Sequence, residues 1–145
     1  TIVAADLISP TKKVNLWLKD EITYSTTSGP DQLVLVGQDN VSIVPDSPDK
    51  LEIRGTFIAQ EGRFGRNHYY CGSYPQYCSK SELEIFGSVV SNARTGTKWI
   101  YSSGAFASGY HERERVFNPK QSLNPPPFLP SILNEFEVQR WEEVE

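Results

Sequence analysis

Cationic and aromatic residues alternate within one short stretch of this chain, from Arg63 to Tyr70. Arginine side chains can grip phosphates, and aromatic rings can stack on nucleic-acid bases or on sugars. Further cationic and aromatic residues around Trp99 would join this stretch if the chain stacks on itself. The candidate ligand-binding residues are Arg63, Arg66, His68, Tyr69, Tyr70 and Trp99. The alternative is an ordinary insertion whose aromatic side chains only pack over the domain.

The two cysteines of the chain, Cys71 and Cys78, follow this stretch directly. Gly72 and Pro75 lie between them, so the chain can turn and bring the two thiols together. A disulfide across so short a loop would contribute about 2–3 kcal/mol in the chain-entropy model, and it would imply an oxidising compartment. We therefore predict a disulfide, against the alternative of two reduced thiols. The cysteines and His68 do not have a standard zinc spacing, so we predict no metal site.

Acidic residues are weaker candidates for chemistry. Glu52 and Glu84 occupy equivalent positions of a repeated phrase and could bind Ca²⁺ or act on a sugar, but such residues more often keep a sheet face soluble. Four further oxygen-bearing side chains match no calcium-loop spacing and are good turn formers. These four are Asp39, Asn40, Asp46 and Asp49. The sequence also lacks a Gly-x-Ser-x-Gly motif, a phosphate loop and a dinucleotide fingerprint. We therefore expect neither an enzyme nor a bound cofactor.

The elements that would position these residues are indicated by a phrase that occurs twice. Residues 51–58 and 83–90 both read apolar-Glu-Ile-x-Gly-small-apolar-apolar. Elsewhere apolar and polar residues alternate, as they do in half-buried β-strands. Leu16, Leu33, Leu51 and Leu83 recur at intervals of about 18 residues once the cysteine-bearing stretch is subtracted. A repeat of this kind predicts stacked coils that bury a shared apolar face.

We therefore predict an all-β fold, a short right-handed parallel β-solenoid of about four coils with an inserted disulfide hairpin and a C-terminal β cap. Residues 1–145 would form a single β domain. Stacked coils would occupy about 14–92, with the insertion at 65–79. Residues 97–145 would hold a β hairpin, a Pro-rich segment and a capping strand. A β-sandwich or another β fold is the alternative, because it also shows short strands separated by turns.

Composition narrows the class of protein. The 145 residues suffice for one domain with a core. The 14 basic and 18 acidic residues give a formal net charge of −4, which disfavours a general nucleic-acid binder. No stretch reaches the ~18 apolar residues of a membrane span. Because the chain contains no methionine, we expect a processed product or an excised domain, with any export signal or membrane anchor upstream of Thr1.

Several phrases, taken in order, resemble a known family. They lie at 44–49, 57–66, 87–92, 108–110, 124–128 and 141–144. In this order they resemble the β-solenoid-like C-terminal domain of bacterial type IV pilus proteins of the PilX-like minor-pilin kind, over about residues 14 to 144. The resemblance implies a β domain displayed outside the cell, with an anchoring N-terminal helix that is absent from this chain. It brings no catalytic residues.

Together these observations predict a non-catalytic extracellular or cell-surface module of bacterial origin that acts in pilus assembly or adhesion. Its partners would be other pilus subunits or surface molecules, and it would contact the membrane only through the missing upstream anchor. One alternative is a DNA- or glycan-binding module that uses the Arg/Tyr-rich hairpin. A second is a bactofilin-like polymer-forming scaffold, although a disulfide would not suit the cytosol.

Overall fold

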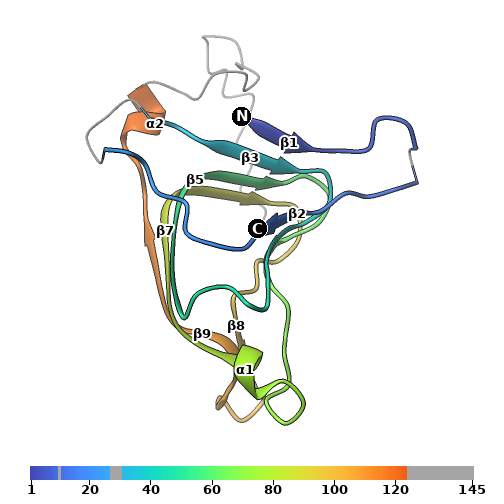
Figure 1. Cartoon of the computed structure of the whole chain (residues 1–145), viewed down its shortest axis with the longest axis vertical. Coiled ribbons are helices and arrows are strands. Elements are labelled where there is room, and N and C mark those ends of the chain that lie inside the picture. The colour runs from blue at the N-terminus through green and yellow to red at the C-terminus, as the bar shows by residue number, and fades with distance from the viewer. Residues whose placement is uncertain (10, 27–30, 124–145) are drawn as a thin grey trace, which may run out of the picture.

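The computed structural model describes residues 1–9, 11–26 and 31–123, which are built mostly of β-strands. Six strands form one sheet, in the spatial order β1 (Ile2–Ala4), β3 (Val34–Gly37), β5 (Lys50–Ala59), β7 (Ser79–Ser91), β9 (Phe106–Val116) and β8 (Lys98–Ile100) (Figure 1). A second sheet contains β2 (Leu16–Leu18), β4 (Val41–Ile43) and β6 (Phe64–Arg66). The two described helices are single turns, α1 (Pro75–Cys78) and α2 (Lys120–Leu123).

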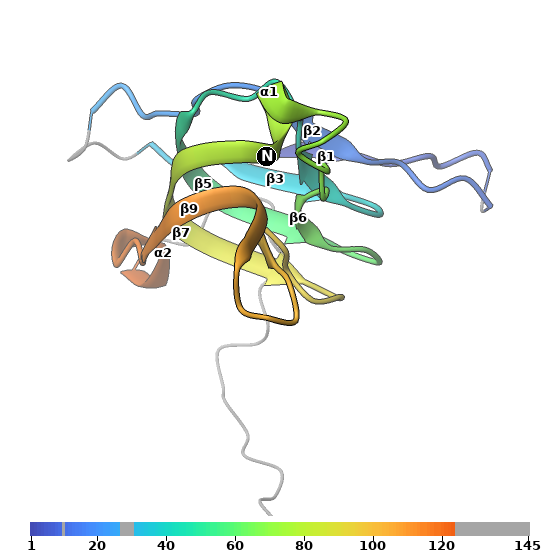
Figure 2. The ribbon, with the colours of Figure 1, turned by 90° about the horizontal axis from the view of Figure 1, so that it is seen from below.

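The chain alternates between the two sheets as it runs from β1 to β7, so neighbouring strands are distant in sequence. Strands pair in parallel throughout the smaller sheet and from β1 to β9 in the larger one. The β8–β9 pair is antiparallel. Figure 2 shows the strands of the larger sheet side by side in a curved layer, with β6 on the opposite side of the molecule.

The hydrophobic core lies between the two sheets. The smaller sheet contributes Leu18, Val41 and Ile43, and the larger sheet contributes Phe57 and Ile85, all of them buried in one cluster. The alternation of the strands explains this arrangement, because every second side chain of a strand points to the same face. Burial of apolar surface at about 25 cal/mol per Å² makes this cluster the main source of stability.

The repeated phrase forms the longest parallel pair of the molecule. Leu51 pairs with Leu83 and Ile53 with Ile85, so the predicted equivalence of the two copies is confirmed. Gly55 and Gly87 also pair, and both have positive φ angles, 151° and 133°. A β-carbon on Gly87 would lie 2.1 Å from the carbonyl oxygen of Gly55. The phrase therefore requires glycine for two reasons, the backbone conformation and the close approach of β5 and β7.

The small hydroxyl residue after each glycine has a separate role. Gln121 of α2 accepts a hydrogen bond from Ser88 at 2.8 Å and donates one to Thr56, also at 2.8 Å. One side chain from the C-terminal end of the described chain thus bridges the two copies of the phrase.

The prediction of a β-solenoid is wrong. The described strands form two open sheets, the larger of which mixes parallel and antiparallel pairs, and they form no closed or solenoid sheet. The 18-residue spacing does not correspond to strand pairing. Leu16 pairs with Val41 in the smaller sheet. The carbonyl oxygen of Leu33 accepts a hydrogen bond from Thr56, so Leu33 is not aligned with Leu51. Equal spacing misled the prediction because loops of unequal length separate the strands.

The other parts of the predicted architecture differ in detail. The insertion at 65–79 is not a β hairpin, because it begins in β6 and passes through the helical turn α1 before β7 starts. The antiparallel strands β8 and β9 occupy the place of the predicted C-terminal hairpin. The Pro-rich segment and the capping strand expected after it lie outside the described residues.

Strand β9 pairs in register with the second copy of the repeated phrase but carries different residue types at the apolar positions. Glu114 pairs with Glu84, whereas Arg113 pairs with Leu83 and Arg115 with Ile85. The core-facing leucine and isoleucine positions are thus taken by arginine in this strand, whose charged stretch is exposed. Within the part of the chain that the structure describes, no further strand pairs with this stretch of β9. Charged side chains along an exposed edge strand oppose the addition of another strand.

Candidate functional site

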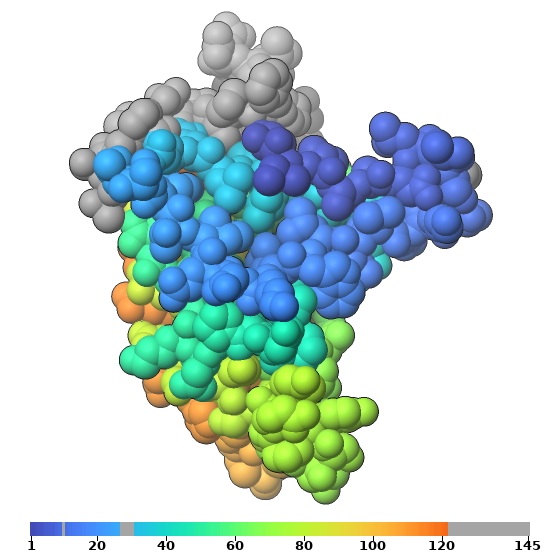
Figure 3. Space-filling model, in the orientation of Figure 1, coloured from blue at the N-terminus to red at the C-terminus, as the bar shows by residue number. Residues whose placement is uncertain are grey.

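The disulfide loop forms a projection at one end of the molecule. The predicted Cys71–Cys78 disulfide is confirmed, with the two Cα atoms 5.0 Å apart. Between the cysteines the chain makes the single helical turn α1, in which the amide of Cys78 donates to the carbonyl of Tyr74 at 3.0 Å. In Figure 3 the residues around α1 stand out as a lobe at the lower end of the molecule.

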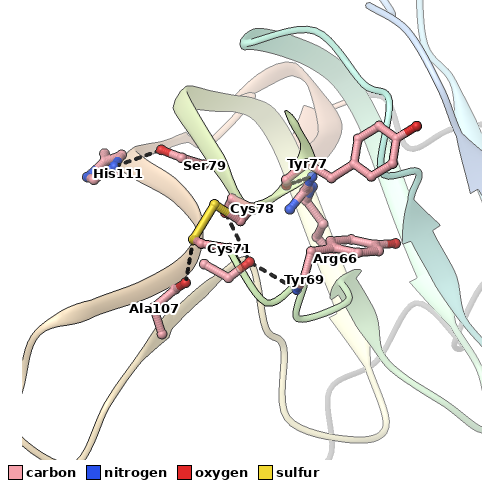
Figure 4. The surroundings of a disulfide bond; sticks show 9 residues. Arg66, Tyr69, Cys71, Tyr77, Cys78, Ser79, Ala107 and His111 are labelled. Carbon is pink, nitrogen blue, oxygen red and sulfur yellow. Dashed lines mark hydrogen bonds between the residues drawn. A yellow bond between two sulfur atoms is a disulfide. The ribbon is translucent and has the colours of Figure 1, made fainter. Parts of the chain in front are cut away.

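Ser108 of β9 fastens this loop to the larger sheet. Its side chain is fully buried, and its Oγ donates to the carbonyl of Cys78 at 3.0 Å and accepts from the amide of Tyr69 at 3.1 Å. The sulfur of Cys71 lies 3.5 Å from the carbonyl oxygen of Ala107, the preceding residue of β9 (Figure 4). Both arms of the loop therefore rest on the same strand, so the loop is held rigidly.

Beneath the loop lies a buried arginine. Arg66 is 1 % exposed, and its guanidinium donates to the carbonyl of Pro45 at 3.0 Å and to that of Tyr77 at 2.5 Å. Its charge lies over the rings of Tyr69, 4.8 Å away, and Tyr110, 5.9 Å away. Both hydrogen bonds come from Nη2, whereas Nε and Nη1 are buried without a hydrogen-bond partner among the described residues and face the aromatic surroundings. Arg66 thus links the 44–49 turn to the disulfide loop in the interior of the protein.

Two titratable groups near Arg66, those of Tyr110 and Lys80, have shifted pKa values. Burial raises the pKa of the Tyr110 hydroxyl, which shares a 3.0 Å hydrogen bond with Ser47. Burial lowers the pKa of the Lys80 ammonium, and the positive charge of Arg66 lowers it further. Lys80 donates to the carbonyl of Ser47 at 2.6 Å. Each of these groups is used in a structural hydrogen bond, so this cluster is best explained as support for the loop.

A basic groove lies beside this support, on the exposed surface. It has a volume of about 400 Å³ and is lined by Arg63, Arg94, Thr95, Gly96, Lys98, Trp99, Ile100 and Arg113. Four of these side chains are cationic and none is acidic. A parallel bridge between Gly65 and Gly96 brings β6 against the turn before β8. The pairing of β8 with β9 then places Lys98 and Arg113 on the same groove.

Two of the cations are held in place by uncharged groups. The Arg63 guanidinium lies over the Trp99 ring, with its carbon 5.5 Å from the ring centre, and donates to Asn67 at 3.0 Å. Trp99 itself donates through Nε1 to the carbonyl of Arg66 at 3.1 Å. The Lys98 ammonium donates to the carbonyl of His111 at 2.7 Å. These contacts orient positive charge without neutralising it.

Among the described residues, four cations outside the groove are ion-paired, whereas the exposed Lys12 and Arg115, like the groove cations, are not. The ion pairs of the described residues join Lys13 to Glu61, Lys19 to Asp46, Lys50 to Glu82 and Arg54 to Glu52. Within residues 1–9, 11–26 and 31–123, none of Arg63, Arg94, Lys98 and Arg113 pairs with a carboxylate. The groove therefore combines uncompensated positive charge with a concave shape, which suits an anionic group.

The structure separates the predicted binding residues into two groups. Arg63 and Trp99 line the groove, and the ring of His68 meets Trp99 edge-on at 6.0 Å. Arg66 and Tyr69 belong to the support beneath the loop, and Tyr70 is exposed at the start of the loop. The alternation of side chains along a strand could have predicted that Arg66 is buried, because Phe64 and Arg66 are two residues apart in β6 and share its buried face.

Arg113 is not among the residues that the sequence predicts for this site. The signal was present in the repeated phrase, because Glu112-Arg113-Glu114-Arg115 continues the pattern of Glu82-Leu83-Glu84-Ile85 with arginine at both apolar positions. Treating residues 112–115 as a third copy of the phrase would have predicted that Arg113 lies beside Leu83, at the edge of the core.

Other kinds of site have less support. Glu52, Glu84 and Glu114 lie in register on adjacent strands. The described residues nevertheless include no group of three or more metal-binding side chains arranged to hold an ion. None of the described helices has the length and apolar character needed to cross a membrane.

No protein-family model, curated protein or solved structure matches this chain. The resemblance to PilX-like minor pilins therefore stays a prediction, and function must be argued from the residues of the site.

Proposed function

We propose that this chain is a non-catalytic interaction module displayed outside the cell or on its surface, of the kind that minor pilins present on a type IV pilus. The observation that carries the proposal is the disulfide loop, which projects from the sheets and is fixed to β9 through Ser108. A disulfide persists in oxidising compartments, and its presence is compatible with an extracellular location. A rigid projection loses little conformational entropy when a partner binds it.

The location is tested in the bacterium that produces the protein. Intact cells are treated with a membrane-impermeant lysine-labelling reagent, and a cytosolic protein serves as the control. We expect labelling of this chain, and mass spectrometry without reductant should find Cys71 linked to Cys78. Recovery of the protein from the cytosol with both thiols free would refute the proposal. A pilus role further predicts that the protein disappears from sheared surface fractions when pilus assembly is blocked.

Ligand binding is a second candidate function, and the basic groove is the observation that favours it. Cations that are oriented but unpaired offer a site for an anionic partner, and the groove lies next to the projecting loop. Retention on an anionic matrix at low salt, and its loss when groove cations are replaced, tests this function. Equal retention of a groove variant would exclude the groove as the binding site.

A further inference from the structure

We propose that the basic groove binds the phosphate groups of single-stranded nucleic acid. This inference rests on the ligand-binding function proposed above and specifies its ligand. Its first support is the charge of the lining: Arg63, Arg94, Lys98 and Arg113 face one hollow of about 400 Å³ that no carboxylate lines. The chain as a whole has a formal net charge of −4. The positive charge of the groove is therefore a local feature, because the net charge of the whole chain is negative.

The second support is that two of the four groove cations are held in place before any ligand arrives. Trp99 and Asn67 hold Arg63, and the carbonyl of His111 holds Lys98. A side chain that is already ordered loses less rotamer entropy on binding. Guanidinium groups also match phosphate geometry, because they can donate two parallel hydrogen bonds.

The surroundings of the groove favour a flexible single strand over a duplex. Glu112 and Glu114 flank Arg113 along β9, and together with Glu82 they line a neighbouring hollow. A rigid duplex carries one negative charge per ~1.7 Å of its axis and would bring phosphates against these carboxylates. A single strand can place a few phosphates in the groove and direct the remainder away.

The Trp99 ring favours recognition by charge over recognition of a sugar ring. Arg63 already lies over the indole, and His68 meets it edge-on. A β-carbon on Gly96 would come within 3.3 Å of the ring, so the backbone there is also close. The aromatic residue that could have stacked on a sugar thus serves to hold a cation.

Fluorescence anisotropy with a labelled twelve-nucleotide oligothymidylate tests the inference, using the oxidised protein. If about three phosphates are neutralised, the logarithm of the association constant should fall with the logarithm of salt concentration at a slope of about −2. This slope corresponds to an affinity loss of about 16-fold between 50 and 200 mM salt. The double variant Arg94→Gln/Arg113→Gln should bind at least about tenfold more weakly, and the salt slope should become less steep by about 0.7 for each lost phosphate contact.

The control is Lys12→Gln/Lys19→Gln, which removes the same formal charge from exposed positions outside the groove lining, one of them, Lys19, ion-paired with Asp46. It should keep the wild-type affinity within about twofold, as expected when only long-range electrostatics change. A twelve-base-pair duplex and a heparin dodecasaccharide serve as competing ligands, and both should bind more weakly than the single strand.

Three results would overturn the inference. They are no binding at 20 mM salt, tighter binding of heparin or duplex than of the single strand, and equal loss of affinity in the groove and control variants. If heparin binds more tightly and the groove variant weakens it, ligand binding survives and only the ligand class is wrong. If no anionic ligand binds, the ligand-binding function fails as well. Surface labelling of intact cells reports on the display function independently of all these results.

Discussion

Replacing Gly87 with alanine should destabilise this protein far more than the same replacement at Gly104. Both glycines have positive φ angles, 133° and 84°, so both variants force alanine into a backbone conformation that it adopts reluctantly. This cost is about 1–2 kcal/mol at either position. The two positions differ in their surroundings. Nothing lies within 4 Å of a β-carbon at Gly104, whereas one at Gly87 would meet the Gly55 carbonyl oxygen at 2.1 Å.

The additional cost at Gly87 follows from what would have to move. The obstructing atoms belong to the backbone of β5, which pairs with β7 from Lys50 to Ala59. Separating these strands would weaken ladder hydrogen bonds worth about 1 kcal/mol each and open the core beneath them. We therefore expect a total loss of about 3–5 kcal/mol, a large part of the 5–15 kcal/mol by which a typical domain is stable.

Equilibrium unfolding in urea, in oxidising buffer, measures the difference. Gly55→Ala should fall between the other two variants, because its β-carbon would lie 2.9 Å from the Leu33 carbonyl oxygen. The expected order of destabilisation is Gly87, Gly55, Gly104. Should the Gly87 variant be too unstable to purify, the comparison of Gly55 with Gly104 still tests the reasoning. Loss of the same free energy at all three positions would show that the backbone conformation alone explains the repeated glycine.

Three further predictions concern the loop and its support. Replacing both cysteines with serine should lower the free energy of unfolding by about 2.5 kcal/mol, the chain-entropy value for a loop of this length, and reducing the wild-type disulfide should have a similar effect in urea titrations; an unchanged midpoint would contradict it. Ser108→Ala should cost about 1.5–3 kcal/mol, because it leaves the buried carbonyl of Cys78 and the amide of Tyr69 without their partner. Hydrogen exchange at residues 69–78 should also accelerate, and normal protection there would show that Ser108 does not hold the loop. Finally, burial raises the folded-state pKa of Tyr110, so the folded state retains its proton at pH values where the unfolded state loses it. The contribution of Tyr110 to stability is complete below about pH 10 and declines as the pH rises through the unfolded-state pKa and then the folded-state pKa. The free energy of unfolding of the wild type should therefore fall more steeply above about pH 10 than the free energy of unfolding of the Tyr110→Phe variant.

The repeated phrase shows where sequence reasoning succeeds. Two copies with the same alternation and the same glycine predicted the pairing of Leu51 with Leu83, because parallel strands with matching patterns bury the same face. The wider 18-residue repeat failed at Leu16 and Leu33. Those leucines share a residue type and a spacing but no local phrase, and spacing alone does not reveal which residues are strand and which are loop.

The candidate site shows the same limit. Arg63 was predicted from the interleaved cations and aromatics at 63–70 and Trp99 from the expected stacking of the chain, and the two do lie together in the groove. Arg66 has the same chemistry as Arg63 but is buried, because it lies on the core face of β6 together with Phe64. Residue type indicated what these side chains can bind, whereas strand register decided which of them faces solvent.

The sequence by itself determined the short disulfide, the glycine phrase and the charged stretch of β9, since each depends on residues that are neighbours along the chain. Only the tertiary structure decided that cations at 63, 94, 98 and 113 meet in one groove. They converge through the Gly65–Gly96 bridge and the antiparallel β8–β9 pair. Such contacts are selected by hydrogen-bond register and by the burial of a shared core. These are properties of the folded chain that no local stretch of sequence contains.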